Sequence, residues 1–251
     1  MKQHTLALTS VTFRSFGVDQ VIALAKEAGL DGIEWGGDIH VPMGDLSAAR
    51  IAGEKTSAAG LSVLSYGSYF TLGADGHGVE YFQTVLETAA ALGAPVVRIW
   101  ARKTPSAECA EDLFLTDVSA LKEYAAMARD HGIRIGIEFH NGTYNDTAES
   151  SLRLLNAVGA PNLRTYWQPI HPYERNLKDI KKLALHIENV HVYNWIYGER
   201  TVRKMLFENA GDWKEYIALI GTRPYVLEFA KDDLSKNFLQ DAKTLHELVG
   251  E

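Results

Sequence analysis

The sequence predicts an α/β fold of the (β/α)8 barrel class, and two observations lead to this prediction. The chain has 251 residues, which is close to the typical size of one such barrel. Glycines that follow a helical stretch and precede an apolar run recur at intervals of about 30 residues or twice that, the length of one strand–helix unit. A left-handed glycine is a common way to end a helix. These glycines are Gly29, Gly60, Gly93, Gly132, Gly159 and Gly221.

Eight apolar runs are predicted to be strands, each followed by a stretch that suits a helix. The strands are expected at residues 5–9, 32–35, 62–64, 96–100, 134–138, 163–167, 190–193 and 225–228. Helices are expected at residues 18–28, 46–59, 80–92, 113–130, 146–158 and 234–248, and the pattern does not delimit those after strands six and seven. Strict alternation predicts a parallel sheet, and eight units without a spare segment favour a closed barrel. No linker or charge block interrupts the chain, so residues 1–251 are predicted to form one domain.

Composition and charge argue against several other classes of protein. The formal net charge of −7 disfavours a nucleic-acid partner, which usually meets an excess of Lys and Arg. Cys109 is the only cysteine, so an intramolecular disulfide or a cysteine-based zinc cluster cannot form. No Gly-x-Gly-x-x-Gly follows the first strand, which argues against a dinucleotide cofactor. Without a signal-peptide pattern or a membrane-spanning apolar run, a cytoplasmic protein with no membrane partner is expected.

Polar side chains gather where the predicted strands end. In barrels of this class, chemistry takes place at the C-terminal ends of the strands and in the loops that follow them. Strands two, five, six, seven and eight carry ionisable or amide side chains at or just beyond these ends, namely Glu34, His40, Glu138, His140, Gln168, His171, His191 and Glu228. The strand ends are therefore the predicted site.

Alternation along the strands predicts which of these side chains point into the barrel. In the fifth strand, isoleucines occupy one face and Glu138 lies on the other, so Glu138 is expected inside. His191 is expected inside because the neighbouring valines suit the helix side. The pattern is a weaker guide to the orientation of Glu228, which shares a face with Val226, since both faces of a parallel strand are buried and apolar.

Two carboxylates and an imidazole that converge in a barrel mouth need a counter-charge, because unpaired buried charge is costly. Hard divalent ions such as Mg²⁺ and Mn²⁺ bind carboxylates with some imidazole, so one hypothesis is a metal site. The alternative is that Glu138 and Glu228 form structural ion pairs. Arg98, Arg102 and Lys231 are available for this.

The order and spacing of four side chains on four successive strands resemble a known family. Glu138, Gln168, His191 and Glu228 match the pattern of the xylose isomerase-like barrels. Within that family, the chain is most similar to the sugar phosphate isomerase/epimerase group, which includes tagatose 3-epimerase, inosose isomerase and hydroxypyruvate isomerase. The resemblance covers essentially the whole chain. It implies that these four residues bind one divalent metal ion, Mn²⁺ or Mg²⁺ with Co²⁺ or Zn²⁺ as alternatives, and that the two glutamates are the catalytic acid/base pair.

The sixth strand departs from the family pattern, since Gln168 stands where the family usually has Asp. An amide oxygen can bind a metal but brings no charge, so weaker metal affinity is expected; the alternative is that Gln168 only hydrogen-bonds water or substrate. The resemblance also implies that His171, three residues later, contacts substrate, as does Arg200 or Arg203 after strand seven. It further implies a small sugar or sugar-derived substrate and the prospect of a homo-oligomer.

Further substrate contacts are predicted among aromatic side chains at the strand ends. Sugar C–H faces pack on such rings, and Trp35, Tyr66 and Trp195 are candidates, with barrel-mouth packing as the alternative. Trp100 and Trp167 are expected to pack outward. His40 is a candidate contact or accessory base, with a solvated loop side chain as the alternative, and His140 a candidate contact or a support for Glu138.

The function predicted from these residues is a metal-dependent sugar isomerase or epimerase that transfers a proton α to the carbonyl of a keto-sugar or polyol ketone. A lyase or dehydratase on a keto-sugar or keto-glycoside would share the metal and the α-proton step. An endonuclease IV-like DNA repair enzyme shares the fold but needs three zinc ions, and the acidic balance of this chain disfavours it. A non-catalytic sugar-binding barrel is the remaining alternative.

Overall fold

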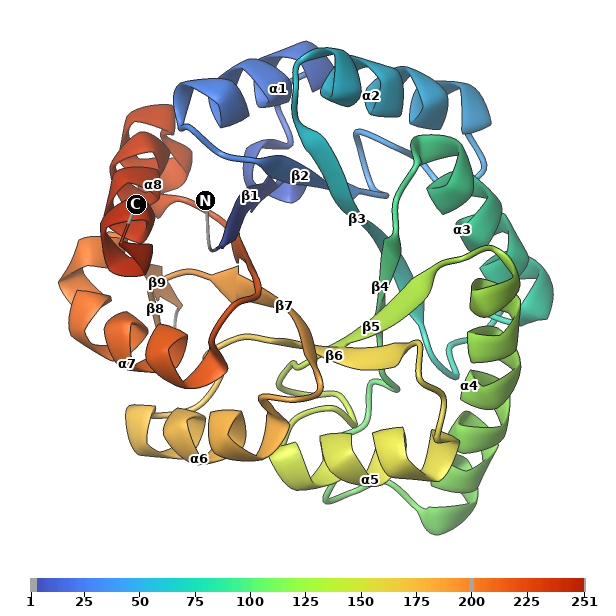
Figure 1. The fold of residues 1–251 in the computed structure, drawn as a ribbon. Helices are drawn as coiled ribbons and strands as arrows, with labels where there is room; N and C mark the ends of the chain where they lie inside the picture. Colours follow the sequence, from blue (N-terminus) through green and yellow to red (C-terminus); the bar gives the residue numbers. More distant parts are fainter. Residues whose placement is uncertain (1–3, 199–200, 251) are drawn as a thin grey trace.

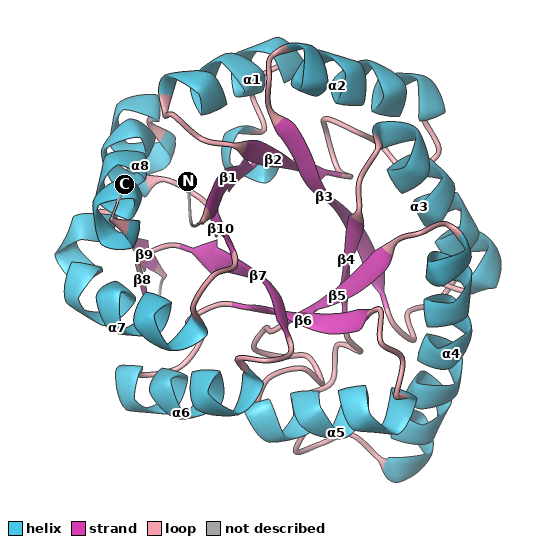
Figure 2. Ribbon diagram, viewed as in Figure 1, coloured by secondary structure: helices cyan, strands magenta, loops and turns pink. Residues whose placement is uncertain are grey.

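The structure, a computed structural model, describes residues 4–198 and 201–250 and confirms the (β/α)8 barrel (Figures 1 and 2). Eight parallel strands close in the order β1-β10-β7-β6-β5-β4-β3-β2. They are β1 (Thr5–Thr9), β2 (Gly32–Gly36), β3 (Ser62–Thr71), β4 (Val96–Trp100), β5 (Arg134–Glu138), β6 (Leu163–Trp167), β7 (Ile187–Val192) and β10 (Pro224–Leu227). The helices that ring them are α1 (Val18–Glu27), α2 (Leu46–Ala58), α3 (Val79–Leu92), α4 (Glu111–Asp130), α5 (Ala148–Val158), α6 (Tyr173–Leu183), α7 (Ala210–Ile220) and α8 (Ser235–Val249).

The glycines that end helices before the next strand adopt the left-handed conformation that the sequence predicted. Gly93 and Gly159 end α3 and α5 with φ angles of 78° and 66°, in the left-handed region that side chains with a Cβ disfavour. Each frees its chain to turn back into the next strand. At the other end of α5, the hydroxyl of Thr147 accepts a hydrogen bond from the Ser150 backbone N–H at 3.0 Å, which satisfies one of the unpaired donors of the first turn.

Small residues inside the barrel make room for large polar ones. A Cβ at Gly67 on β3 would lie 2.7 Å from the Arg98 guanidinium, and a Cβ at Gly136 on β5 would lie 2.4 Å from the ring of Tyr166. Both contacts are closer than packed atoms tolerate. The absence of a side chain at these two positions therefore allows an arginine and a tyrosine to fill the barrel interior beneath its mouth.

The chain departs from strict strand–helix alternation after β7. A two-stranded antiparallel hairpin, β8 (Trp195–Ile196) and β9 (Val202–Arg203), precedes the short 3-10 helix η2 (Leu206–Asn209) and α7. Two further 3-10 turns, η1 (Ser10–Phe13) and η3 (Lys231–Asp233), follow β1 and β10. The sequence pattern did not predict the hairpin, because its strands are only two residues long.

Within residues 4–198 and 201–250, no helix is both long enough and apolar enough to span a bilayer.

Candidate metal centre

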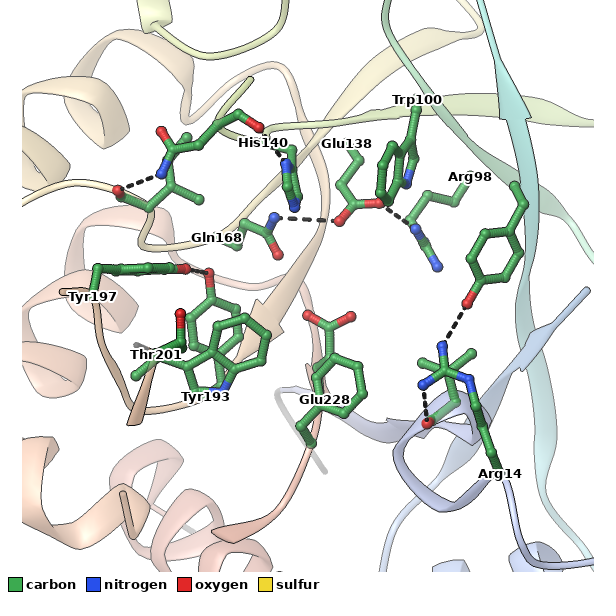
Figure 3. A pocket seen from close by; sticks show the side chains of 16 residues that line it. Arg14, Arg98, Trp100, Glu138, His140, Gln168, Tyr193, Tyr197, Thr201 and Glu228 are labelled. Atoms are coloured by element: carbon green, nitrogen blue, oxygen red, sulfur yellow. Dashed lines mark hydrogen bonds and ion pairs between the residues drawn. The ribbon is translucent and has the colours of Figure 1, made fainter. Parts of the chain in front are cut away.

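A cavity of about 410 Å³ opens at the C-terminal ends of the barrel strands, which is within the usual range for small-molecule sites. Its charged and amide lining comes from β4, from the end of β5 and the residues after it, and from the residues directly after η1, β6 and β10. Its aromatic lining comes from β3, β4, β8 and the residues after β7, β8 and β10. Figure 3 shows Glu138 and Glu228 pointing toward each other across this cavity, with Gln168 to one side and Arg98 to the other. The two glutamates therefore converge, as the sequence predicted.

Glu138 ends β5 and is surrounded by hydrogen-bond donors. Its Oε2 forms a short ion pair with Arg98 Nη1, and its Oε1 accepts from Gln168 Nε2 at 3.3 Å. The side chain is almost fully buried. Burial raises the pKa of this carboxyl, but the charges of Arg98 and His191 outweigh burial and hold the pKa below its usual value. Glu138 is thus an ionised carboxylate.

Glu228 follows directly after β10 and has fewer donors. Its Oε2 lies 3.3 Å from Nδ1 of His191. Burial raises the pKa of Glu228, and although His191 opposes this, the nearby charge of Glu138 adds to it, so the net direction is upward. The two glutamates of one cavity are therefore driven in opposite directions, a pattern found where one carboxyl gives a proton and another takes one.

His191 lies at the centre of the site, fully buried on β7. Its Nε2 is 3.3 Å from Oε1 of Glu34, and its Nδ1 is 3.3 Å from both Glu228 Oε2 and the Gln168 amide oxygen. Burial lowers the pKa of the imidazole, but Glu228 and Glu34 outweigh this and the net direction is upward. Both ring nitrogens thus face oxygen acceptors.

The donor set fits a divalent cation. One ligand atom each from Glu138, His191 and Glu228 lies within 4.8 Å of the others, and the amide oxygen of Gln168 faces the same point. Metal binding requires deprotonated ligands, and with His191 neutral and the carboxyls of Glu34, Glu138 and Glu228 all ionised, the one guanidinium of Arg98 leaves two negative charges. One divalent ion would balance them, and carboxylate, amide oxygen and imidazole are ligands that such ions accept.

The ion-pair alternative is realised in part. Arg98 on β4 pairs with Glu138 and, through Nε at 3.1 Å, with Glu34. The other two candidate cations pair elsewhere. Arg102 contacts Asp117 at 2.6 and 2.8 Å, and Lys231 contacts the neighbouring Asp232 at 2.7 Å. Oε1 of Glu138, which accepts from the neutral Gln168 amide, and the carboxyl of Glu228 therefore pair with none of these three cations and are available to a metal ion.

Of the predicted substrate contacts, two line the cavity. His140 stacks on Trp100 with ring centroids 5.0 Å apart, and Trp195 stacks on Tyr193 at 4.4 Å. Trp100 itself also lines the cavity, which corrects the expectation that it packs outward. Trp167 does pack outward, against Trp213 and Tyr216 of α7.

Two predicted aromatic contacts are turned away from the cavity, and this changes their expected role. Trp35 is fully buried on the helix side of β2, where its indole N–H donates to Thr56 Oγ1 at 3.1 Å. The hydroxyl of Tyr66 donates to the carbonyl of Val41 at 3.0 Å. Side chains held in this way support the barrel wall, and neither is expected to touch a molecule in the cavity.

Three predicted polar contacts also lie outside this cavity. Nε2 of His40 bonds the carbonyl of Phe16 at 3.0 Å, and Nε2 of His171 bonds that of Asp146 at 2.7 Å. Arg203 forms a short ion pair with Asp233 and lies over the ring of Phe229, at the rim. Arg200, the alternative to Arg203, lies outside the described residues.

The structure also brings in residues that the sequence pattern missed. Tyr69 and Phe229 line the cavity with φ angles of 58° and 55°, and left-handed backbone in such large residues is strained and concentrates at functional sites. The hydroxyl of Tyr69 accepts from Arg14 at 2.8 Å, and Arg14 pairs with Asp38 at 2.5 Å. Sequence alone carries no signal for this rim, because the four residues come from four separate parts of the chain, on β3 and after η1, β2 and β10.

The sequence profile described as xylose isomerase-like TIM barrel matches residues 22–246 of the chain. A comparison of this chain with curated protein sequences found no match. Many solved structures share its fold, among them three that match over nearly their whole length. The probable 3-DHS dehydratase AsbF from Bacillus anthracis has 20% identity and a TM-score of 0.81, with 97% of this chain and 98% of that chain covered.

The other two are less similar in fold. The IOLI protein, solved with a bound zinc atom, has 17% identity and a TM-score of 0.75, with 98% of each chain covered. A D-allulose 3-epimerase from Methylomonas sp. has 15% identity and a TM-score of 0.74, with 99% of each chain covered. At such identities the likeness is one of fold.

Proposed function

The chain belongs to the xylose isomerase-like TIM barrel family, and we propose that it is a divalent-metal-dependent isomerase or epimerase that acts on a keto-sugar or a related polyol ketone. The observation that carries this proposal is the pair of glutamates that face each other across the cavity, with His191 and Gln168 beside them. The zinc atom bound by the IOLI protein and the epimerase among the similar structures support it.

The two glutamates would perform the proton transfers. Glu138, kept ionised by Arg98, suits removal of the proton α to the carbonyl. Glu228, whose pKa is raised by burial, suits return of a proton from the other side of the cavity, and each such group typically contributes about 10²–10⁴-fold. Glu138, Gln168, His191 and Glu228 would hold the metal ion, which when bound supplies positive charge for the substrate oxygens as negative charge develops.

The cavity walls suit a substrate with apolar C–H faces. Trp100 and His140 form one stacked aromatic wall, and Tyr193 and Trp195 form another. Aromatic faces of this kind bind large apolar surfaces with little loss of side-chain entropy. A sugar or polyol ring held between them would present its carbonyl to the glutamates.

A dehydratase is the second candidate, and Tyr193 favours it. Tyr193 lines the cavity, and its hydroxyl lies 2.9 Å from that of Tyr197, which places a phenolic proton within reach of a bound molecule. After a glutamate removes the α-proton, this phenol could protonate a β-hydroxyl, which would leave as water with formation of a C=C bond. The probable dehydratase among the similar structures supports the same chemistry.

The test is a screen of keto-sugars and polyol ketones with the Mn²⁺-loaded protein in deuterated water, followed by NMR. An isomerase or epimerase should introduce deuterium at or beside the α-carbon without loss of oxygen. A dehydratase should release water and form an alkene or enol. If neither deuterium incorporation nor elimination occurs with any ketone of the panel, the proposal is wrong.

A further inference from the structure

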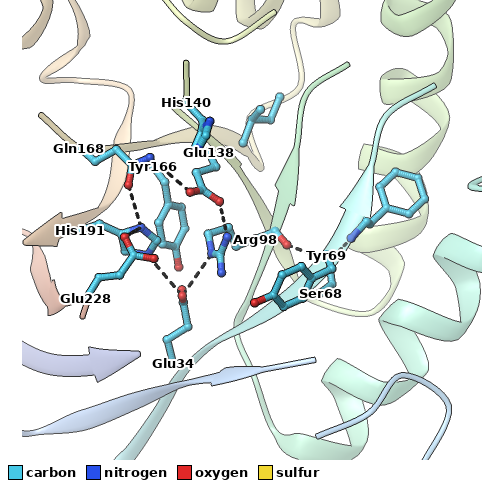
Figure 4. A network of polar contacts seen from close by, with 12 residues as sticks. Glu34, Ser68, Tyr69, Arg98, Glu138, His140, Tyr166, Gln168, His191 and Glu228 are labelled. Atoms are coloured by element: carbon cyan, nitrogen blue, oxygen red, sulfur yellow. Dashed lines mark hydrogen bonds and ion pairs between the residues drawn. The ribbon is translucent and has the colours of Figure 1, made fainter. Parts of the chain in front are cut away.

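Glu34 is a buried carboxylate that the roles assigned above leave unexplained. It lies on β2, none of its surface is exposed, and it is not among the residues that line the cavity. Figure 4 shows its carboxylate pointing toward both Arg98 and His191. Direct contact with substrate is therefore not its function, yet a buried carboxylate needs partners to offset its lost hydration.

Three donors provide these partners. Arg98 Nε lies 3.1 Å from Oε1, Nε2 of His191 lies 3.3 Å from the same oxygen, and the Ser65 hydroxyl donates to Oε2 at 2.8 Å. The carboxylate thus connects β2 to β3, β4 and β7. Two of these partners, Arg98 and His191, also contact the candidate metal ligands Glu138 and Glu228.

The contact with His191 determines which ring nitrogen can bind a metal. A neutral imidazole carries one N–H and one lone pair. Both ring nitrogens face a carboxylate at 3.3 Å, Nε2 that of Glu34 and Nδ1 that of Glu228, but Nδ1 also faces the Gln168 amide oxygen and with it the point where an ion would lie. With an ion at that point the lone pair belongs on Nδ1, and the N–H on Nε2 donates to the Glu34 carboxylate. In the opposite tautomer, the lone pair of Nε2 would face the Glu34 carboxylate oxygen and be repelled by it. The proton would then lie on Nδ1, where a metal would bind.

The contact with Arg98 has a second consequence. Arg98 divides its donors between Glu34, through Nε, and Glu138, through Nη1. The guanidinium is thereby held on the Oε2 side of Glu138, while Oε1 faces Gln168. Both ligand atoms, Nδ1 of His191 and Oε1 of Glu138, are kept available by the same buried carboxylate.

We infer that Glu34 is a positioning residue for the metal centre, which presents Nδ1 of His191 and Oε1 of Glu138 to the ion by accepting hydrogen bonds from His191 and Arg98. The inference rests on the proposed function in one respect, that the site binds a divalent ion. Removing a group that orients a metal-binding histidine typically costs about 10–100-fold in metal affinity.

The experiment measures the dissociation constant of Mn²⁺ alone by isothermal titration calorimetry. Glu34→Ala should weaken binding about 10–100-fold. Glu34→Gln should restore most of the affinity, because its amide oxygen can still accept from His191 Nε2 while its amide group meets the Ser65 oxygen. Glu188→Ala is the matched control. This carboxylate lies on the same strand as His191 and pairs with Arg134 at 2.8 Å, outside the site, so wild-type affinity is expected.

Different results would overturn different statements. If wild type binds no Mn²⁺, Mg²⁺, Co²⁺ or Zn²⁺, the proposed metal-dependent function fails together with this inference. If wild type binds Mn²⁺ and Glu34→Ala binds it equally well, only the positioning role fails. The same holds if Glu34→Gln is as weak as Glu34→Ala, since charge alone would then explain the loss.

A third variant keeps the test decisive if Glu34→Ala does not fold, as circular dichroism would reveal. Glu34→Asp retains the charge but withdraws the carboxylate from His191 by one methylene. A positioning role predicts weaker Mn²⁺ binding by Glu34→Asp than by Glu34→Gln, whereas the reverse order would contradict it.

Discussion

The two sides of the cavity hold the same kind of side chain in different ways. On the β5 side, Glu138 is fixed by Arg98 and Gln168, which hold its two oxygens. On the β10 side, Glu228 has His191 as its close polar neighbour and follows the strand rather than belonging to it. The pKa of the first is lowered and that of the second is raised. Two chemically identical groups thus acquire different protonation behaviour from their neighbours alone.

The largest expected effect is on turnover, and it tests whether both sides are needed. Glu138→Gln and Glu228→Gln each keep the shape of the side chain but remove its ability to exchange a proton. With a substrate found in the screen, each should lower kcat by at least about 10²–10⁴-fold. Wild-type rates in either variant would remove that glutamate from the acid/base pair.

The next effect concerns the counter-charge on the β5 side. Arg98→Met leaves Glu34 and Glu138 buried without their guanidinium, so urea unfolding of the metal-free protein should show a loss of about 3–5 kcal/mol. Arg134→Met is the control, because its pair with Glu188 is half-exposed and should be worth less than about 1 kcal/mol. If both variants lost the same free energy of unfolding, the buried ion pairs of Arg98 would stabilise the protein no more than the half-exposed pair of Arg134.

A smaller effect is expected from the ligand between the two glutamates. Gln168→Asp adds a negative charge where Gln168 faces His191 Nδ1 and Glu138 Oε1. The Coulomb gain with a divalent ion is partly offset by the cost of burying the charge, so calorimetry should show Mn²⁺ binding tightened about tenfold. Unchanged or weaker binding would indicate that residue 168 does not contact the ion.

The smallest effect is a difference in pH dependence of the metal-free protein. Because the folded pKa of Glu228 is raised above its unfolded value of about 4.5, its favourable contribution is present below that value and is lost as pH rises through the folded pKa. Glu228→Gln should therefore raise Tm by a few degrees at neutral pH and have no effect well below pH 4.

Glu138→Gln should act in the opposite direction, because the folded pKa of Glu138 is lowered. Its contribution is present above the unfolded pKa and is lost as pH falls through the folded value. Thermal unfolding of both variants from about pH 3 to pH 8 gives the two signs directly. The same sign for both would contradict the difference between the two sides of the cavity.

Local patterns in the sequence predicted the barrel and part of the site. Glycine recurrence and alternation of apolar residues depend on neighbours in the chain, so they gave the strands and the inward orientation of Glu138 and His191. The pattern did not show that Trp35 faces α2, since both faces of a parallel strand are apolar. It also did not connect Glu34 to His191, because those residues are 157 positions apart and meet only after the barrel closes.

The hairpin after β7 places part of the substrate-contacting wall on a different segment of the chain from the candidate metal ligands. Trp195, Tyr197 and Thr201 contribute a wall of the cavity from β8 and from residues that follow it, whereas the candidate metal ligands lie on the barrel strands or directly after β6 and β10. A graft or library confined to the hairpin would thus vary the shape that the cavity accepts while leaving the proton-transfer groups in place. Substrate range in this scaffold can change by local exchange, without rebuilding the reactive centre.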